Sequence, residues 1–206
     1  PTDFLEKNLL IQTNVIKNAF EIGCRRLIFL GSSCIYPRDC PQPIKEENLL
    51  SGHLEKTNEA YAIAKIAGIK LCEAYNRQFK TDFRSIMPTN LYGYGDNYDL
   101  SSSHVIPALI RKAHEAKVKN FDSFQVWGSG KALREFLFVE DLADACLHIF
   151  NIPKKKYMEN TSLNCSHINV GSGKEISIKS LAKIISNVVG FKGKIVFDSS
   201  KPDGTP

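Results

Sequence analysis

The chain has 206 residues, 43% of them hydrophobic and 24% charged, and its 27 basic and 22 acidic side chains give a net charge of +5. This composition is typical of a globular protein with one sizeable core, and it excludes a disordered or repetitive chain. No apolar run approaches membrane-spanning length, and no charged segment followed by an apolar stretch opens the chain. We therefore expect no membrane partner, no secretion and a cytoplasmic location.

The cysteines and the basic residues argue against two further kinds of site. The six cysteines form no C-x-x-C pair and no spacing typical of a zinc site, so we expect reduced thiols and no metal. The densest basic run, at 154–156, is typical of a solvated loop, and we expect no nucleic-acid partner. The mild positive balance suits an anionic small molecule.

Hydrophobic periodicity predicts alternating elements in the first half of the chain. Apolar residues recur at helical spacing until Gly23 ends the first helix. A short, continuously apolar run follows, as expected of a parallel strand buried on both faces. Thr57 or Asn58 can cap the next helix. In chain order we expect a helix over 4–22, a strand over 26–30, a turn-rich segment over 37–58, a helix over about 59–79 and a strand from 82 that runs into a loop at Pro88.

The second half continues the alternation. Acidic residues open one of its helices, which favours a helix start there, and Gly190 ends the last helix. We expect a helix over 103–117, a strand within 123–130, a helix over 139–150, a variable loop over 150–166, a strand over 166–171, a helix over 177–190 and a last strand over 194–198. Alternating strands and helices predict an α/β protein with a largely parallel sheet.

The sequence contains no glycine-rich turn of the G-x-x-G-x-x-G kind between a strand and a helix. Such a turn normally binds the pyrophosphate of a dinucleotide. The first predicted element is a helix, and the last residues read KPDGTP. We therefore expect these residues to be the middle and later part of a longer protein.

A tyrosine and a lysine in the helix over 59–79 form a candidate acid–base pair. Tyr61 and Lys65 are four residues apart and therefore lie on the same helical face. A phenol has a pKa of about 10, and a neighbouring ammonium group favours the phenolate and lowers that pKa. The pair can then exchange a proton with a carbonyl or an alcohol. The same spacing also arises by chance, with a packed tyrosine and a solvated lysine.

Polar and aromatic side chains follow the first strand at every second position, as Ser32, Cys34 and Tyr36. If the extended geometry continues that far, they share one face. Ser32 could then hydrogen-bond the same substrate oxygen as Tyr61. A strand-end serine followed by Y-x-x-x-K resembles the catalytic triad of the extended short-chain dehydrogenases/reductases. Members of that group act on nucleotide sugars and bind a nicotinamide cofactor on a Rossmann sheet.

Further motifs resemble one family within that group, the GDP-L-fucose synthase family, and cover nearly the whole chain. They are GSSCIYP, NEAYAIAKIAGIKLCEAYNRQ, MPTNLYG, SHVIPALI, VWGSG, REFLFVEDLA and SHINVGSG. The resemblance implies a Rossmann-like, doubly wound parallel sheet whose N-terminal part is missing, with a smaller C-terminal α/β substrate-binding lobe. It assigns 1–95 and 136–170 to the Rossmann domain, 96–135 to a substrate-binding segment and 171–206 to the lobe.

The resemblance also implies a reaction, in which GDP-4-keto-6-deoxymannose is epimerised at C3 and C5 and then reduced at C4. Cys34 and His104 would be the proton-transfer pair, because inversion needs one group to remove a proton and another to return it on the opposite face. Tyr61 would protonate the new oxyanion, and Ser32 and Lys65 would complete the catalytic set. Stabilisation of charge at the C4 oxygen would serve both steps.

Binding residues are implied in the same way. Those expected to contact NADP(H) are Tyr61, Lys65, Pro88, Thr89, Asn90, Leu91 and His104. Those expected to contact the GDP-sugar are Lys112, Trp127, Arg134 and Asp203. An arginine can clamp a diphosphate and a tryptophan can stack on an apolar face. Ordinary structural roles are the alternatives, with Cys34 a small buried side chain, His104 a helix cap or a solvated side chain, and Trp127 a packed aromatic.

Alternative functions remain at this point. A 4,6-dehydratase of the same fold would carry an acidic pair where Ser33 and Cys34 stand, and a simple 4-epimerase has no need of the thiol. A non-catalytic binding module is the alternative from another class, because without a glycine turn the pyrophosphate lacks its binding site. We expect the 206 residues alone to be inactive. The helix over 59–79 is apolar over much of its circumference, and the resemblance implies that it pairs in a homodimer.

Overall fold

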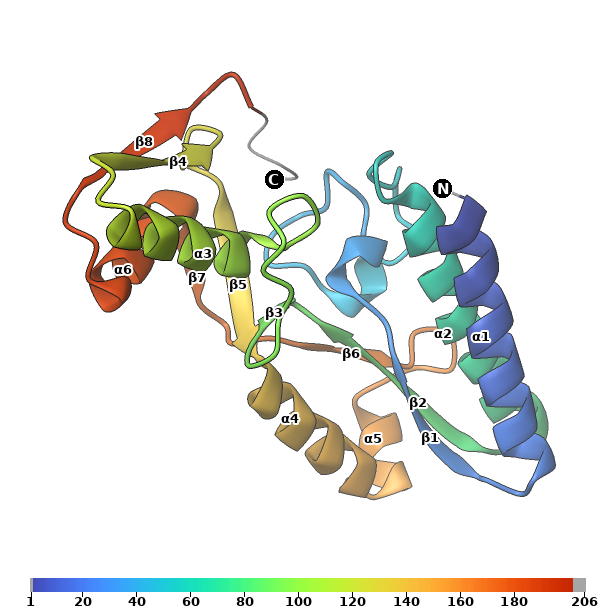
Figure 1. Cartoon of the computed structure of the whole chain (residues 1–206). Coiled ribbons are helices and arrows are strands. Elements are labelled where there is room, and N and C mark those ends of the chain that lie inside the picture. Colours follow the sequence, from blue (N-terminus) through green and yellow to red (C-terminus); the bar gives the residue numbers. More distant parts are fainter. Residues whose placement is uncertain (1, 202–206) are drawn as a thin grey trace. The chain divides into compact units, whose positions relative to one another are not determined.

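A computed structural model describes residues 2–201 and shows an α/β protein with parallel strands of the Rossmann type (Figure 1). The chain divides into two compact units. Unit 1 is formed by the residues up to Thr89 and by Glu140–Gly171, and unit 2 by Asn90–Val139 and the residues from Ser172 onward. Of the helices between residues 2 and 201, none combines the length and the apolarity needed to cross a bilayer.

Unit 1 is built on a parallel sheet with the strand order β1-β2-β6. Its helices and strands are α1 (Thr2–Glu21), β1 (Arg26–Leu30), α2 (Glu59–Phe79), β2 (Asp82–Pro88), α4 (Val139–Asn151), α5 (Lys154–Glu159) and β6 (His167–Val170). Two short 3-10 turns, η1 (Ser33–Ile35) and η2 (Glu46–Asn48), lie between β1 and α2. Six of the seven residues of β2 are buried, which is typical of a central parallel strand covered on both faces.

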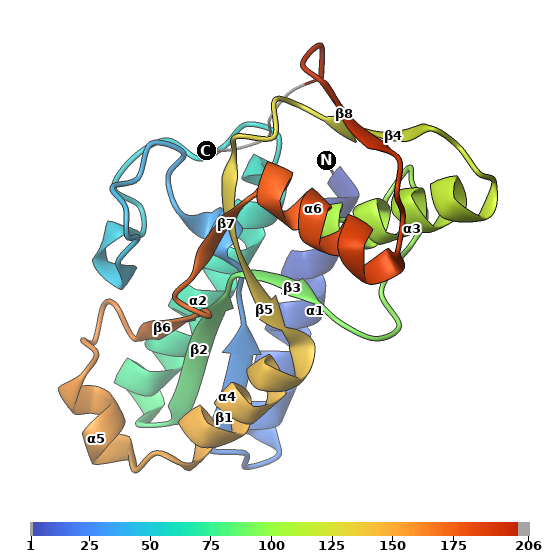
Figure 2. The same ribbon diagram turned by 90° about the vertical axis from the view of Figure 1, so that its left-hand side faces the viewer.

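Side chains of β2 point alternately into two cores of unit 1. Phe83 and Met87 pack in a cluster with residues of α1 and α2, such as Ile16 and Ile69. Ile86, on the other face, packs with side chains of α4 and α5. Both views show α1 and α2 side by side against β1 and β2 (Figures 1 and 2). The sheet of unit 1 is therefore covered by helices on both faces.

Gly68 sets the distance between α2 and the strand beneath it. A Cβ atom at this position would lie 2.3 Å from Cζ of Phe29 and 2.9 Å from Oε1 of Gln12. Gln12 is buried, and its amide donates to the carbonyl oxygen of Ala64 at 2.6 Å. Because backbone and side chains meet this closely, only glycine fits at the contact.

Unit 2 contains a sheet of order β3-β5-β7 and a two-stranded parallel sheet β4-β8. Its elements are β3 (Asn90–Tyr92), α3 (Val105–Val118), β4 (Ser123–Trp127), β5 (Leu133–Phe138), β7 (Glu175–Ser177), α6 (Ile178–Val189) and β8 (Lys194–Asp198). α3 and α6 lie side by side (Figure 2) and bury Leu109 and Leu181 in a core that also includes Phe124 and Val126 of β4.

The first strand ends where it was predicted to end, and its extended geometry does not continue through Tyr36. β1 stops at Leu30, and residues 33–35 form η1, because the Ser32 hydroxyl caps this turn by accepting a hydrogen bond from the Cys34 amide at 3.3 Å. Cys34 is exposed whereas Tyr36 is buried. The condition under which Ser32, Cys34 and Tyr36 would share one strand face is therefore not met.

The segment expected to be a variable loop over 150–166 contains a helix, α5. The basic run of the sequence lies in this helix, and Lys154 Nζ donates to the carbonyl oxygens of Lys80 and Thr81 at 2.9 and 2.7 Å. Lys154 therefore links α5 to the segment between α2 and β2 by hydrogen bonds and is not a purely solvated charge. The short strands β5 and β7 are further elements that periodicity did not predict.

Candidate active site

The candidate catalytic residues of unit 1 gather at the carboxyl end of β1. Ser32 and Cys34 follow this strand directly, and Tyr61 and Lys65 lie in the first turns of α2, which packs against it. Ligand sites of parallel α/β sheets lie at the carboxyl ends of the strands. The structure thus brings together four residues of the predicted catalytic set at the expected edge.

The Tyr61 phenol lies close to the Ser32 side chain and to the Cys34 thiol. Burial raises the pKa of Tyr61, and negative charge on Cys34 would raise it further, whereas the contact with Ser32 lowers it. At neutral pH the phenol is therefore a proton donor. A carbonyl oxygen that enters this site can accept hydrogen bonds from the two hydroxyl groups.

Lys65 acts differently from the sequence-based expectation. Its Nζ donates to the carbonyl oxygen of Leu30 at 2.9 Å and lies 5.7 Å from the centre of the Tyr61 ring. Burial lowers the pKa of Lys65 itself. The ammonium is directed at the end of β1, and burial dominates at the phenol. The predicted lowering of the Tyr61 pKa by Lys65 is therefore wrong for this structure, in which that pKa is raised.

A buried hydrogen-bond network anchors the segment that carries Cys34. The Tyr36 hydroxyl donates to Oδ1 of Asn169 at 2.5 Å and lies 3.1 Å from Nε2 of His167, both on β6. The backbone N–H of Asn169 in turn donates to the Glu46 carboxylate at 2.8 Å. Sequence reasoning did not find these partners, because more than a hundred residues separate Tyr36 from β6 and no local pattern marks the contact.

Two residues expected to contact the cofactor lie at the end of β2. Pro88 is paired with Val170 of β6, and the Thr89 amide donates to the Val170 carbonyl oxygen at 3.1 Å. The Thr89 hydroxyl is buried and has no hydrogen-bond partner within residues 2–201. Buried hydroxyl groups are normally satisfied, so an unsatisfied one at the carboxyl edge of the sheet fits a site for a polar ligand such as a nicotinamide cofactor.

The remaining cofactor candidates belong to unit 2. Asn90 and Leu91 form part of β3, and the Asn90 side chain is already engaged, donating to the Glu135 carbonyl oxygen at 3.0 Å. His104 occupies the N-cap position of α3 and is exposed, but its side chain makes no capping hydrogen bond. The interpretation of this imidazole as a helix cap is therefore not supported, and it remains available to a ligand.

Two of the predicted substrate residues form one cluster in unit 2. Trp127 is 57% exposed at the end of β4, and Lys112 Nζ lies 5.1 Å from the centre of its ring. Lys201 Nζ approaches the same ring at 5.7 Å. An exposed aromatic flanked by two ammonium groups contradicts the packed-aromatic alternative and suits an anionic ligand with a flat or apolar face.

Arg134 lies on β5 and donates to the carbonyl oxygen of Leu133 at 2.6 Å. Asp203 lies outside the described residues. Between residues 2 and 201, no three His, Cys, Asp or Glu side chains are grouped so that they could hold a metal ion.

Comparisons with known proteins agree with the geometry. Residues 1–171 match the model of the NAD dependent epimerase/dehydratase family. The chain is 55% identical over 206 residues to the GDP-L-fucose synthase of Escherichia coli (strain K12) and 58% identical over 206 residues to that of Sinorhizobium fredii (strain NBRC 101917 / NGR234). Both alignments cover 100% of this chain, which spans 64% and 63% of the lengths of those relatives.

A solved structure extends the comparison to the fold. The GDP-D-glycero-L-gluco-heptose synthase from Campylobacter jejuni, solved in the presence of NADPH, superposes with a TM-score of 0.91 at 38% identity. The match covers 96% of this chain and 67% of that chain.

Proposed function

The chain belongs to the NAD dependent epimerase/dehydratase family, and we propose that the enzyme containing it converts GDP-4-keto-6-deoxy-D-mannose to GDP-L-fucose. The observation that carries this proposal is the identity of 55% and 58% over all 206 residues to two curated GDP-L-fucose synthases. The GDP-heptose synthase is less similar, at 38%. A 6-deoxyhexose is therefore better supported than a heptose as the sugar.

In the proposed epimerisation, Cys34 and His104 exchange protons with C3 and C5 of the sugar. A hydrogen next to a carbonyl is acidic because the resulting enolate spreads its charge onto the oxygen, and inversion requires a donor on the opposite face. Both side chains are exposed, and neither makes a hydrogen bond to another residue between 2 and 201. This supports their use by a substrate.

In the proposed reduction, Tyr61 donates its proton to the C4 oxygen while Ser32 holds that oxygen by a hydrogen bond. The raised pKa of Tyr61 keeps the phenol protonated until then. Bound NADPH supplies the hydride. Lys65 fixes the start of α2 to the end of β1 through Leu30, and so positions Tyr61. The same oxygen contacts stabilise the enolate during epimerisation, which allows one site to perform both steps.

Binding of the two ligands is proposed to divide along the chain. Residues 1–95 and 136–170 would hold NADP(H) through Tyr61, Lys65, Pro88, Thr89, Asn90 and Leu91, and His104 of the segment 96–135 would also contact it. Residues 96–135 and 171–206 would hold the GDP-sugar through Lys112, Trp127, Arg134 and Asp203. The unsatisfied Thr89 hydroxyl supports the first assignment, and the exposed Trp127 ring with its ammonium neighbours supports the second.

We further propose a cytoplasmic homodimer that pairs through the helix over 59–79, now α2. Seven residues of α2 are buried within the chain, and its exposed large apolar side chains include Ile63 and Phe79. Helix α1 contributes further exposed apolar side chains. Those of α1 are Phe4, Leu10, Ile11 and Val15, and the exposed Ile22 follows directly after this helix. Light scattering should give twice the chain mass at micromolar concentration, and a monomer there would refute the dimer.

Solvent-deuterium incorporation tests the catalytic roles in a full-length enzyme that contains this sequence. Cys34→Ser and His104→Gln should each reduce labelling at C3 and C5 by at least about 10²-fold, the size of effect expected for a general acid or base. Cys24→Ser and His114→Gln are matched controls that should leave labelling unchanged. Labelling that survives both test substitutions would overturn the assignment.

The 206 residues alone should not oxidise NADPH in the presence of the keto sugar. The reason is that the sequence holds no glycine-rich turn for the pyrophosphate. Loss of NADPH absorbance measures this directly, with the full-length enzyme as the positive control. Turnover by the 206-residue chain would contradict this expectation while supporting the proposed reaction.

A further inference from the structure

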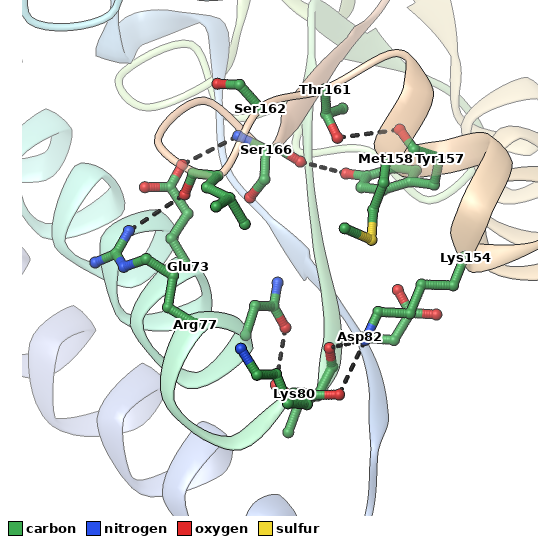
Figure 3. A pocket seen from close by; sticks show the side chains of 13 residues that line it. Glu73, Arg77, Lys80, Asp82, Lys154, Tyr157, Met158, Thr161, Ser162 and Ser166 are labelled. Carbon is green, nitrogen blue, oxygen red and sulfur yellow. Dashed lines mark hydrogen bonds between the residues drawn. The ribbon is translucent and has the colours of Figure 1, made fainter.

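A cavity lies in unit 1, away from the candidate catalytic residues. It measures about 560 Å³ and is lined by the end of α2, the start of β2, α5 and the segment that follows α5 (Figure 3). Thr81 and Asp82 at the start of β2, and Ser166 just before β6, belong to its wall. Because β1, β2 and β6 are parallel, this cavity is at the amino edge of the sheet, opposite Ser32 and Tyr61. Its size suits a small organic ligand.

The cations of this cavity have no acidic partner. Arg77, Lys80 and Lys154 line it, and none of them forms an ion pair within the described part of the chain. Arg77 donates to the carbonyl oxygen of Leu163 at 3.2 Å, and Lys154 donates only to backbone carbonyl oxygens. Within residues 2–201 their positive charge is therefore not neutralised by an ion pair.

The two carboxylates of the cavity are already paired with other residues. Glu73 accepts a hydrogen bond from Lys70 at 2.9 Å, and Asp82 accepts one from Arg84 at 2.7 Å. Neither is free to neutralise the cations named above. The cavity thus presents a net positive charge to a ligand.

Ser166 supplies a second, independent sign of a ligand. It is 9% exposed, and its hydroxyl has no hydrogen-bond partner within residues 2–201. Its backbone is satisfied, since the amide donates to Glu73 at 3.1 Å and the carbonyl oxygen accepts from the Tyr157 hydroxyl. Figure 3 shows the Ser166 side chain directed toward the space between α2 and α5. A buried hydroxyl without a partner requires an explanation, and a bound polar molecule gives one.

Apolar surface completes the cavity. The exposed side chains of Met158 and Leu163 line it together with the buried Tyr157. We propose that this cavity is a second binding site, for a small phosphorylated organic molecule. The phosphate lies near Lys80 and Arg77, the organic part lies against Met158 and Leu163, and the Ser166 hydroxyl hydrogen-bonds the ligand. Sugar phosphates and nucleotides share this chemistry. The site does not depend on the proposed catalytic function.

Titration calorimetry on the 206-residue chain tests this site with four probes: AMP, glucose 6-phosphate, inorganic phosphate and uncharged adenosine. AMP or glucose 6-phosphate should bind more tightly than both inorganic phosphate and adenosine, and the tighter of the two identifies the organic part. Binding should weaken with added salt, because the attraction is electrostatic. The proposal fails if no probe binds at millimolar concentration, or if adenosine binds as well as AMP.

Two substitutions and a matched control locate the binding. Lys80→Gln should weaken binding of the tighter probe by about tenfold, the value of one charge-assisted hydrogen bond. Lys155→Gln, on an exposed residue of α5 outside the cavity lining, should leave it unchanged. Ser166→Ala should weaken binding without lowering the unfolding midpoint, since no hydrogen bond within the described residues is lost. Equal effects of the two lysine substitutions would overturn the proposal.

Amide chemical shifts separate this site from the proposed substrate site. The preferred probe should perturb the amides of Thr161 and Ser166. Perturbation confined to the Trp127 indole would place the ligand in unit 2 and overturn the proposal, without bearing on the proposed reaction.

Discussion

The two units bury their parallel strands to different extents. In unit 1, six of the seven residues of β2 are buried, whereas in unit 2 the residues of β4 alternate between exposed and buried. Both strands pair in parallel, but β2 has helices on both faces, and the buried side chains of β4 all enter the core of α3 and α6. The number of covered faces, rather than the direction of the strand, therefore decides the hydrophobic pattern.

The candidate functional residues follow the same division. Tyr61 and Lys65 in unit 1 are partly buried, Tyr61 lies close to Ser32, and Lys65 donates a hydrogen bond to Leu30. Trp127 in unit 2 is largely exposed, and its described contacts are with two ammonium groups. Changes in unit 1 should therefore disturb folding and chemistry together, while changes at the substrate residues of unit 2 should leave folding intact.

Loss of the buried charge of Arg84 should have the largest effect on stability. This side chain is 1% exposed and donates to both oxygens of Asp82 at 2.8 and 2.7 Å. Arg84→Met leaves the carboxylate without its main partner and should lower the free energy of unfolding by about 3–5 kcal/mol. Urea denaturation followed by circular dichroism measures the change.

Arg26 provides the matched control for Arg84. It reaches the same Asp82 carboxylate at 3.5 Å, but its side chain is 44% exposed. Arg26→Met should cost about 0–1 kcal/mol, as is usual for an exposed ion pair. Equal losses for both substitutions would mean that burial does not determine the strength of these pairs.

Gly68→Ala should have the next largest effect. The added methyl group would overlap the Phe29 ring, so α2 must move away from β1, at a cost of about 1–3 kcal/mol. In the full-length enzyme kcat should fall as well, because the same shift separates Tyr61 from Ser32. Gly23→Ala is the control: nothing lies within 4 Å of its added Cβ, and only its positive φ of 88° is strained. Gly23→Ala should therefore lower the free energy of unfolding and leave the kcat of the full-length enzyme unchanged.

Acidification should weaken unit 1 through His167. Burial lowers the pKa of His167 in the folded chain, so the unfolded chain takes up a proton first as the pH falls below about 6.5. Stability is then lost with falling pH, by at most about 1.4 kcal/mol per pH unit, until the folded-state pKa is reached. Urea midpoints at pH 7 and pH 5 should differ less in His167→Gln than in the parent. The exposed control, His114→Gln, should retain the parent's dependence, and a flattened response there would refute the assignment.

Trp127→Ala should have the smallest effect on stability, within about 0.5 kcal/mol, because most of this ring is in contact with solvent. Affinity of the full-length enzyme for GDP should nevertheless fall, by about tenfold or more, through loss of stacking. Calorimetry with GDP measures this. A large loss of stability with unchanged affinity would indicate a structural role for the ring and remove the contrast between the units.

The alternating elements of the fold were predictable from the sequence, because continuously apolar runs and helical periodicity are local signals. The turn after β1 was not, since the Ser32 hydroxyl caps η1 and ends the extended geometry within two residues. The buried Arg84 was also unpredictable from composition, although an aspartate two positions earlier on the same strand face is a usable signal. The Tyr36 network links residues too distant in the chain for any periodicity to reveal.

The sequence predicted which residues form the candidate active site, but it did not predict the direction of the Lys65 ammonium or of the Tyr61 pKa shift. Family motifs selected Ser32, Cys34 and Tyr61, and the structure places them together. The direction of the Lys65 ammonium depends on the exact distance between α2 and the end of β1, which no motif contains. The amino-edge cavity arises from α2 and α5, and α5 falls in the segment where the family resemblance is weakest.

The absence of a side chain at Gly68 sets the distance between α2 and β1 next to the proposed reaction centre. Helix α2 packs on the Phe29 ring at that point, and Tyr61 and Lys65 lie less than two turns earlier in the same helix. The distance between the proposed proton donor, Tyr61, and the Ser32 hydroxyl therefore depends on the packing of Gly68 against Phe29, outside the proposed substrate contacts. Selection for catalysis would act on this glycine as strictly as on the tyrosine, and a survey restricted to reactive groups would overlook it.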